Sequence, residues 1–314
     1  MPNITKGISV VIPVFNSAKI LPKLVERLSL VLPELDKNFE LLLVNDGSQD
    51  DSWHKIKEAC GQHNWIYGIS LMRNYGQHNA ILAGVRLAKF DVTITLDDDL
   101  QHPPNQILKL VNKLTDEVDV VYGIPDKEPH GVFRGFASRI LKMCLRHALG
   151  SEVARNVSAF RAFRTKLRNG FQDYNSTFVS IDVLLSWCTR RFAAVKVDHH
   201  VRKIGTSNYN FFRLLQHAST LITGFSVLPL QLASLLGFLI TAFGFIILTY
   251  VSINYIINES SVPGFPFLAS IIAIFSGAQM FSLGIIGEYL ARMHFRLMNR
   301  PVYFISDEAK SKKF

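Results

Sequence analysis

The chain has 314 residues, of which 48% are hydrophobic and 19% charged, and its formal net charge is +9. These proportions exclude a disordered chain, a collagen-like chain and a disulfide-rich scaffold. The charge is unevenly spread, because Glu259 is the only charged residue between positions 218 and 287. The sequence therefore predicts a soluble domain over residues 1–215, a membrane segment over 216–290 and a cytoplasmic tail over 291–314.

The three cysteines and the N-terminus point to a cytosolic soluble domain. Cys60, Cys144 and Cys188 are widely spaced and form no metal-binding pattern, so reduced thiols are expected. The apolar run at 8–15 contains Pro13 and lacks the basic start and cleavage site of a secretory signal. It is better explained as a first strand.

Short apolar runs alternate with helical patterns along the soluble part. Strands are predicted at 8–14, 40–44, 66–71, 92–96 and 118–122, with helices at 18–32, 52–61, 79–88 and 105–114. This alternation is typical of an α/β fold with a mostly parallel sheet and helices on both faces. Ligands of such folds bind beyond the carboxyl ends of the strands.

Polar residues follow four of these strands. The most informative run is Asp97-Asp98-Asp99, since three adjacent carboxylates repel one another unless cations or hydrogen bonds offset the repulsion. Asp97 and Asp99 would lie on one side and suit Mg²⁺ or Mn²⁺ bound to a diphosphate. The alternative to a metal site is that these carboxylates cap the next helix. The turn Asn45-Asp-Gly-Ser48 could likewise be a tight turn that caps the helix after it. No dinucleotide-binding glycine motif and no P-loop occurs.

Two apolar runs are long enough to cross a bilayer, at about 228–255 and 265–286. Basic residues precede the first and follow the second, while the connecting turn has no Lys or Arg. Both termini and the soluble domain are therefore expected in the cytoplasm. Small residues at Ala269, Ala273 and Gly277 fit packing within one chain or between copies, and a homo-oligomer is expected.

A basic amphipathic segment at 132–149 has apolar residues at helical spacing and no acidic residue. Such a helix suits an anionic membrane surface, although an ordinary core-packing helix shares the pattern. A second interfacial stretch is predicted at 209–220. Arg134 and Ser138 are one helical turn apart and share a face.

Four ordered motifs carry a resemblance to a known family: Val11-Ile-Pro-Val-Phe-Asn16, Val44-Asn-Asp-Gly-Ser48, Arg73-Asn-Tyr-Gly76 and Leu96-Asp-Asp-Asp-Leu-Gln101. Together they resemble family 2 glycosyltransferases of the GT-A fold. More narrowly, the chain resembles polyprenyl-phosphate glycosyltransferases, a group that includes bactoprenol glucosyltransferase, dolichyl-phosphate mannose synthase and undecaprenyl-phosphate formamido-arabinose transferase. The resemblance extends to Arg300-Pro-Val-Tyr303 and covers nearly the whole chain.

The resemblance implies roles for individual residues. The nucleotide-sugar would be held by Pro13, Phe15, Asn16, Asp46, Arg73, Asp97, Asp98 and Gln101. Mg²⁺ or Mn²⁺ would be held by Asp97, Asp99 and Gln101, and the lipid phosphate by Arg134, Ser138 and Arg161. The catalytic set would be Asp97, Asp99, Arg134 and Arg202.

Some positions depart from the family pattern or stay open. Asn45 and Asn208 stand where many members have Asp and Lys, and Ile124-Pro125 stands where an Arg is common, so Arg202 is the candidate for that charge. Asp182 fits buried structure or a site equally well. His199-His200, beside Asp198, fits a strand end better than a metal site.

The expected function is inverting transfer of a sugar from a nucleotide-sugar, a UDP-sugar, to polyprenyl (undecaprenyl) phosphate at the cytoplasmic face of the inner membrane. The product would serve cell-envelope glycan modification. The partners are the donor, the lipid phosphate and the bilayer, and nucleic acid is not expected despite the basic charge. The alternatives are a processive polysaccharide synthase of the same fold and a non-catalytic membrane scaffold.

Overall fold

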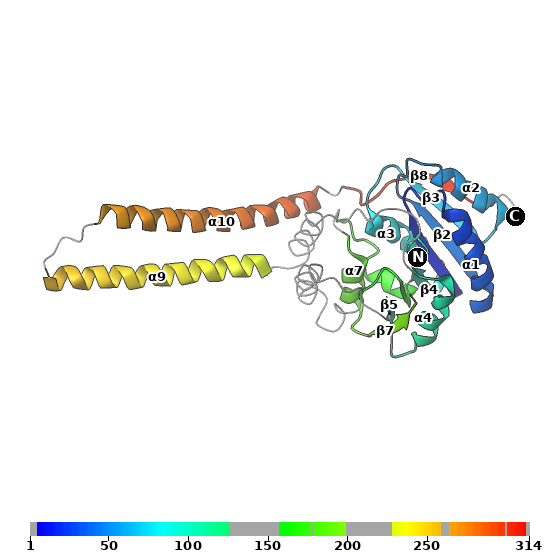
Figure 1. Ribbon diagram of the computed structural model, residues 1–314, viewed down its shortest axis with the longest axis horizontal. Coiled ribbons are helices and arrows are strands. Elements are labelled where there is room, and N and C mark those ends of the chain that lie inside the picture. The colour runs from blue at the N-terminus through cyan, green and yellow to red at the C-terminus, as the bar shows by residue number, and fades with distance from the viewer. Residues whose placement is uncertain are drawn as a thin grey trace. The chain divides into compact units, whose positions relative to one another are not determined.

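The computed structural model describes residues 5–125, 157–176, 179–198, 228–258, 264–298 and 300–311. The chain divides into two compact units, Met1–Phe211 with Asn299–Phe314, and Phe212–Met298. The first unit is the α/β domain and the second contains two long helices (Figure 1). The segment after the second helix thus belongs to the α/β domain, although the sequence predicted only a tail there.

One mixed sheet organises the first unit. In the described residues it has eight strands in the order β7-β5-β6-β4-β1-β2-β3-β8 (Figure 1). The strands are β1 Thr5–Val14, β2 Phe39–Asn45, β3 Ile66–Leu71, β4 Phe90–Thr95, β5 Val120–Pro125, β6 Arg161–Arg164, β7 Phe192–Val197 and β8 Ile305–Ala309. The helices of this unit are α1 Leu21–Leu35, α2 Ser52–Gln62, α3 Gln77–Leu87, η1 Pro104–Gln106, α4 Ile107–Lys113, η2 Thr165–Gly170 and α7 Ile181–Cys188.

The predicted α/β class and the mostly parallel sheet are confirmed. β3, β2, β1 and β4 are parallel neighbours, while β6 and β8 run antiparallel to the strands beside them. The sequence did not predict β6 or β8, and it gave no strand range for β7. β6 and β8 are short and polar, so neither shows the apolar run or the regular alternation by which strands are identified.

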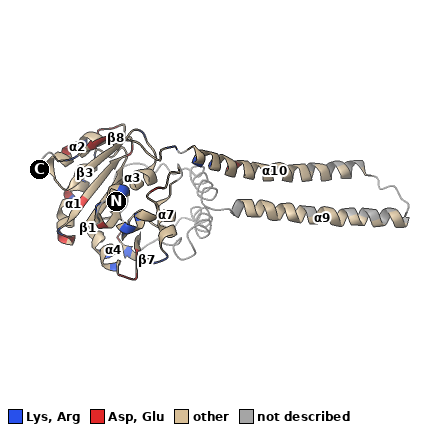
Figure 2. Cartoon of the chain, turned by 180° about the vertical axis from the view of Figure 1, so that it is seen from behind, with Lys and Arg blue, Asp and Glu red and all other residues tan. Residues whose placement is uncertain are grey.

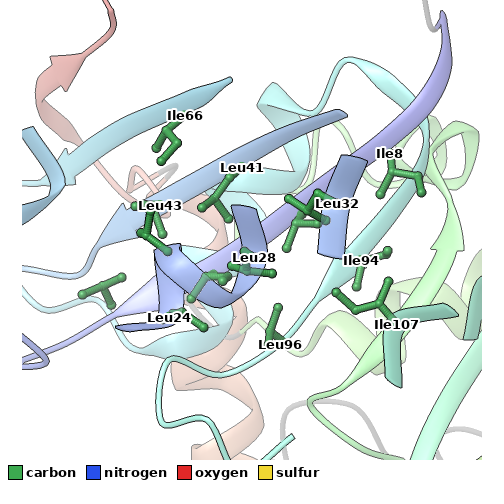
Figure 3. Packing of buried hydrophobic residues seen from close by; sticks show 14 of the residues in the cluster. Ile8, Leu24, Leu28, Leu32, Leu41, Leu43, Ile66, Ile94, Leu96 and Ile107 are labelled. Atoms are coloured by element: carbon green, nitrogen blue, oxygen red, sulfur yellow. The ribbon is translucent and has the colours of Figure 1, made fainter. Parts of the chain in front are cut away.

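Two layers of apolar side chains fix the helices to the sheet. On one face, Leu24, Leu28 and Leu32 of α1 recur at four-residue spacing and pack with Leu41 and Leu43 of β2 (Figure 3). The opposite face buries α3 and α7 in a second cluster. Because successive strand residues point to opposite faces, each apolar strand contributes to both layers. All four parallel strands are thereby held at one level, with their carboxyl ends together.

Two of the three cysteines lie within the described residues. Cys60 is buried and Cys188 is partly buried, and neither forms a disulfide. Burial raises the pKa of Cys60 to about 11. Cys144 lies outside the described residues.

The second unit contains α9 (Leu228–Asn258) and α10 (Phe265–Leu297), which contact each other. Among the described residues one stretch, Leu230–Ile247 of α9, has the length and composition to cross a membrane, with a mean hydropathy of 2.1. Figure 2 shows α9 without a charged residue along its length. The two-span topology remains a prediction.

Close contact between α9 and α10 occurs at Gly244, where an added Cβ would lie 2.9 Å from Phe275 Cζ. By contrast, a Cβ on Gly277 would meet no atom within 4 Å. The α9–α10 contact therefore does not use Gly277 of the small-residue stripe. The homo-oligomer remains a prediction.

Two helical glycines give a matched test of the packing. At Gly84 of α3 an added Cβ would lie 2.4 Å from Val11 Cγ1, whereas at Gly61 of α2 it would meet nothing within 4 Å. We expect Gly84→Ala to destabilise the fold by about 1–3 kcal/mol through overpacking. Gly61→Ala should be neutral or stabilise it by up to about 1 kcal/mol, because Ala favours helix. Thermal unfolding of the purified full chain measures both, and equal effects would contradict this packing.

Candidate active site

Four loops at the carboxyl edge of the sheet are joined to one another by hydrogen bonds. The loops are residues 15–20 after β1, 46–51 after β2, 72–76 after β3 and 96–103 after β4. We call these four loops the loop ring. Its bonds are Phe15 N to Asp98 Oδ2 (3.3 Å), Asn16 N to Ser48 Oγ (3.0 Å), Tyr75 N and Gly76 N to the Asp46 carboxylate (2.7 and 2.9 Å), and Gln77 Nε2 to Asp97 Oδ1 (2.5 Å). The last donor lies in the first turn of α3, directly after its loop. The ring thus brings together residues from four separate sequence motifs.

Asp46 joins the second and third loops. Its side chain is 3% exposed, and its two oxygens accept the N–H groups of Tyr75 and Gly76. Burial raises the pKa of Asp46, and these two hydrogen bonds lower it in part. The structure therefore gives Asp46 the role of holding the 72–76 loop, and its predicted contact with the nucleotide remains a proposal.

Gly47 allows the same two loops to touch. Its φ is +65°, and an added Cβ would lie 2.4 Å from the Arg73 carbonyl carbon and 2.5 Å from Asn74 N. Asn45 precedes this turn, donating from Nδ2 to Ser70 Oγ at 2.9 Å and accepting from Ser48 N. Asn45 thus joins the end of β2 to β3.

The acidic loop after β4 has strained backbone. Leu100 adopts φ +58°, which costs a bulky residue about 1–2 kcal/mol. Beside it, Gln101 N donates to Asp99 Oδ1 at 3.1 Å. Strain of this kind concentrates at functional sites, where the surrounding structure holds it. Asp97, Asp98 and Asp99 are all partly exposed, so their carboxylates reach the surface at this edge.

The acidic loop suits a divalent cation that is shared with a substrate. Asp97, Asp99 and Gln101 offer hard oxygen atoms from one short segment. Within the described ranges, no group of three or more His, Cys, Asp or Glu side chains is arranged to hold a metal by itself. Mg²⁺ is commonly held by one or two carboxylates together with substrate phosphates, so a protein-only cage is not required.

The predicted nucleotide residues lie around the ring. Pro13 is buried within β1, while the Phe15 side chain is 46% exposed. Arg73 is exposed, and its guanidinium carbon lies 4.7 Å from the centre of the Tyr75 ring. Asn16 adopts φ +53° and accepts Gln49 N on its side-chain oxygen at 2.8 Å. An exposed ring and an exposed cation beside carboxylates are suitable partners for a base and its phosphates.

Comparisons with known proteins decide the family. A model of glycosyl transferase family 2 matches residues 9–174. The chain belongs to this family. The predicted resemblance is thus confirmed, and the enzyme is a glycosyltransferase.

Individual relatives and solved structures agree with this assignment. A protein of Pectobacterium carotovorum subsp. carotovorum (strain PC1), undecaprenyl-phosphate 4-deoxy-4-formamido-L-arabinose transferase, is 34% identical over 303 residues, which are 96% of this chain and 93% of the relative. Glucosyl-3-phosphoglycerate synthase from Mycobacterium tuberculosis, solved with Mn²⁺, UDP and glucosyl-3-phosphoglycerate, has a TM-score of 0.52 at 18% identity. That alignment covers 69% of this chain and 78% of the synthase. A second mycobacterial protein has a TM-score of 0.51 at 19% identity, over 69% of this chain and 73% of that one. At these identities the solved structures establish the fold alone.

The predicted binding of the lipid phosphate by Arg161 of this glycosyltransferase remains a proposal, and the structure buries this side chain. The side chain is 2% exposed; its guanidinium pairs with Asp182 and donates from Nε to Thr95 Oγ1 at 3.0 Å. Tyr122 donates to the same Asp182 oxygen at 2.9 Å. Burial, with Asp182 nearby, raises the pKa of Tyr122 well above its usual range. Asp182 is therefore a buried partner of Arg161 and Tyr122.

Three predicted site residues, Arg134, Ser138 and Arg202, lie outside the described residues, as do the segments 132–149 and 209–220. Asn208 and His199-His200 lie outside them too, whereas Asp198 accepts Gln106 Nε2 at 3.0 Å. Gln77 was not predicted as a site residue, although its side chain contacts Asp97. The sequence feature that could have identified Gln77 is its position directly after Gly76, where a helix begins.

The buried ion pair gives a stability test. Asp182→Asn keeps the shape and the acceptor for Tyr122 but leaves the Arg161 charge buried without a counter-charge. We expect this change to lower the free energy of unfolding by about 3–5 kcal/mol. Adding Arg161→Met to Asp182→Asn should recover most of the loss, because it removes the buried charge and keeps an acceptor for Tyr122. Thermal and denaturant unfolding of the purified enzyme measure both, and an unaffected single variant would contradict the pairing.

Proposed function

We propose that this enzyme transfers a sugar from a UDP-sugar to undecaprenyl phosphate at the cytoplasmic face of the inner membrane, with inversion at the anomeric carbon. The observation that carries the proposal is the loop ring, which gathers an exposed aromatic ring, an exposed cation and an acidic loop at one edge of the sheet. That set matches the chemistry of a nucleoside diphosphate with a divalent cation.

The acceptor is proposed from the Pectobacterium relative, which is named for undecaprenyl phosphate and aligns with 96% of this chain. The apolar surface of α9 supports a membrane location. Large side chains such as Phe238, Ile246 and Ile257 are 70%, 67% and 71% exposed. Apolar area of this kind is unfavourable in water and suits a bilayer, where a lipid acceptor would lie. The predicted orientation, with both termini in the cytoplasm, is part of this proposal.

The donor and metal are proposed from the geometry of the acidic loop, together with the mycobacterial synthase that was solved with Mn²⁺ and UDP. Asp97, Asp99 and Gln101 would hold Mg²⁺ or Mn²⁺. Phe15, Asn16, Asp46 and Arg73, with Pro13 beneath them and Asp98 beside them, would hold the nucleotide. When bound, the cation supplies charge stabilisation for the diphosphate leaving group.

On the acceptor side, the nucleophile needs no general base. A phosphate monoester has a second pKa of about 6 and is largely dianionic at neutral pH. The chain's task is to bring that anion to a second anion, the donor diphosphate. Arg134, Ser138 and Arg202 would bind the acceptor phosphate and offset the repulsion between the two. Direct attack by the phosphate oxygen on the anomeric carbon then releases UDP and inverts the configuration.

A labelled-sugar assay tests the reaction. Membranes containing the full chain are incubated with a panel of labelled UDP-sugars and undecaprenyl phosphate. We expect label in a lipid fraction that mild acid releases, because the product is a glycosyl phosphate. Label in an insoluble polymer would favour a processive synthase. Absence of transfer across the donor panel would favour the non-catalytic scaffold.

Substitutions in the acidic loop test the metal site. We expect Asp99→Asn and Asp97→Asn each to lower kcat/KM by about 100-fold or more, since each removes a charge facing the cation. Chelation by EDTA should abolish transfer, and Mn²⁺ or Mg²⁺ should restore it. Asp116→Asn is the matched control, because Asp116 is fully exposed and precedes β5 at the opposite edge of the sheet. Near-normal turnover of Asp99→Asn with metal present would contradict the assignment.

A further inference from the structure

The C-terminal segment Val302–Ser306, at the beginning of β8, lies against the part of the sheet that leads into the loop ring. β8 pairs antiparallel with β3, and Leu71, the last residue of β3, is the register partner of Ile305. One residue further, Met72 N donates to Phe304 O at 2.9 Å. Met72 is the first residue of the 72–76 loop, and Arg73 follows it directly. Residues 302–306 lie outside the 9–174 range that the family model matches.

The same segment also fixes the helix on the other side of that loop. Val302 is 5% exposed and belongs to the core cluster that α3 and β3 share. The Tyr303 ring lies 5.6 Å from the Arg86 guanidinium carbon of α3, and Arg86 Nη1 donates to the Tyr303 hydroxyl at 3.5 Å. Arg86 Nη2 donates to Tyr174 O at 2.8 Å, which holds the guanidinium in place. The segment therefore contacts both elements that flank the 72–76 loop.

The loop also has contacts of its own among the described residues: Tyr75 packs against the core cluster that α3 and β3 share, and Asn79 Nδ2 donates to Tyr75 O at 2.5 Å. On its inner side it contacts the second loop of the ring, through Gly47 and the Asp46 carboxylate. The hydrogen bonds from Tyr75 N and Gly76 N to Asp46 form only when the end of β3 and the start of α3 are correctly placed relative to the turn after β2. The C-terminal segment contacts Met72, where the loop leaves β3, and it contacts α3 through Arg86 in the last turn of that helix. Positioning of this kind is a common way for a remote segment to control a site.

We propose that Val302 and Tyr303 are positioning residues of the donor site: the chain returns after α10 to pin β3 against α3 and so hold the Arg73–Gly76 loop in its nucleotide-binding form. This inference rests on the proposed donor site for its effect on binding. Its structural part, the control of the 72–76 loop, stands on the contacts alone.

The opposite end of the same strand pair offers a matched control. Tyr67 of β3 donates to Glu308 Oε2 at 2.5 Å, and Lys310 Nζ lies 4.8 Å from the centre of its ring. Tyr67 and Tyr303 therefore each combine one hydroxyl hydrogen bond with one cation–ring contact between β8 and its neighbours. Tyr67 lies at the far end of β3 from the loop ring.

The experiment compares Tyr303→Leu with Tyr67→Leu in the full chain, with Val302→Ser as a second variant should Tyr303→Leu fail to fold. Hydrogen exchange is measured on peptides covering residues 72–77, and UDP affinity is measured with Mn²⁺ present. We expect Tyr303→Leu and Val302→Ser to speed exchange at Tyr75 and Gly76. We also expect them to weaken UDP binding about three- to tenfold, which corresponds to the loss of about one hydrogen bond. Tyr67→Leu should lower Tm and leave both readouts unchanged.

Two outcomes would overturn the inference. Unchanged exchange at 72–77 in Tyr303→Leu and Val302→Ser would show that the segment does not hold the loop. Equal effects of Tyr303→Leu and Tyr67→Leu would show that β8 only stabilises the sheet edge. If the unmodified chain bound no UDP, the proposed donor site would fail instead, and the exchange measurement would still decide the positioning role.

Discussion

The candidate site depends on a single constraint, the common level at which four parallel strands end. Each strand leaves polar backbone groups and a polar loop at that edge, and the groups left there need partners. In this chain the loops supply hydrogen-bond partners to one another. The buried Asp46 carboxylate accepts two of these hydrogen bonds and connects the second loop of the ring to the third. Burial of a charged carboxylate is unfavourable unless hydrogen bonds compensate for the lost water. The two hydrogen bonds from Tyr75 N and Gly76 N provide this compensation, and they also hold the 72–76 loop beside the turn after β2.

A second buried group supports the acidic loop from below. β6 enters the sheet antiparallel between β4 and β5, and this places Arg161 beside Thr95, two residues before Asp97. Asp182 of α7 neutralises Arg161. An ion pair in the interior adds little net stability but strongly disfavours other arrangements, because breaking it leaves a buried charge. The last residue of β4 is thus bound to this pair, five residues before the strained Leu100.

Helix α9 and the α/β domain differ in where their apolar side chains lie. α9 carries no charged residue, and most of its large apolar side chains are exposed, whereas the α/β domain buries its apolar residues in two layers. A chain that averages 48% hydrophobic thus contains one helix with exposed apolar side chains and one domain that buries most of its own. This division suits an enzyme whose donor is water-soluble and whose acceptor is a lipid, which is the chemistry that we propose.

The sequence by itself determined the α/β class, the parallel core strands and the motifs at their ends, because apolar periodicity and local turn chemistry are properties of neighbouring residues. It also identified the acidic loop of Asp97–Asp99. Only the tertiary structure decided what each polar residue contacts. Nothing in the residues around Arg161 and Asp182 distinguishes a buried ion pair from a ligand-binding site. The two side chains are buried together because β6 lies between β4 and β5. β8 is similar, since five polar-rich residues form a strand only because β3 leaves an open edge for them. Contacts between residues more than 200 positions apart, such as Phe304 with Met72, have no local signature, so the fold alone established them.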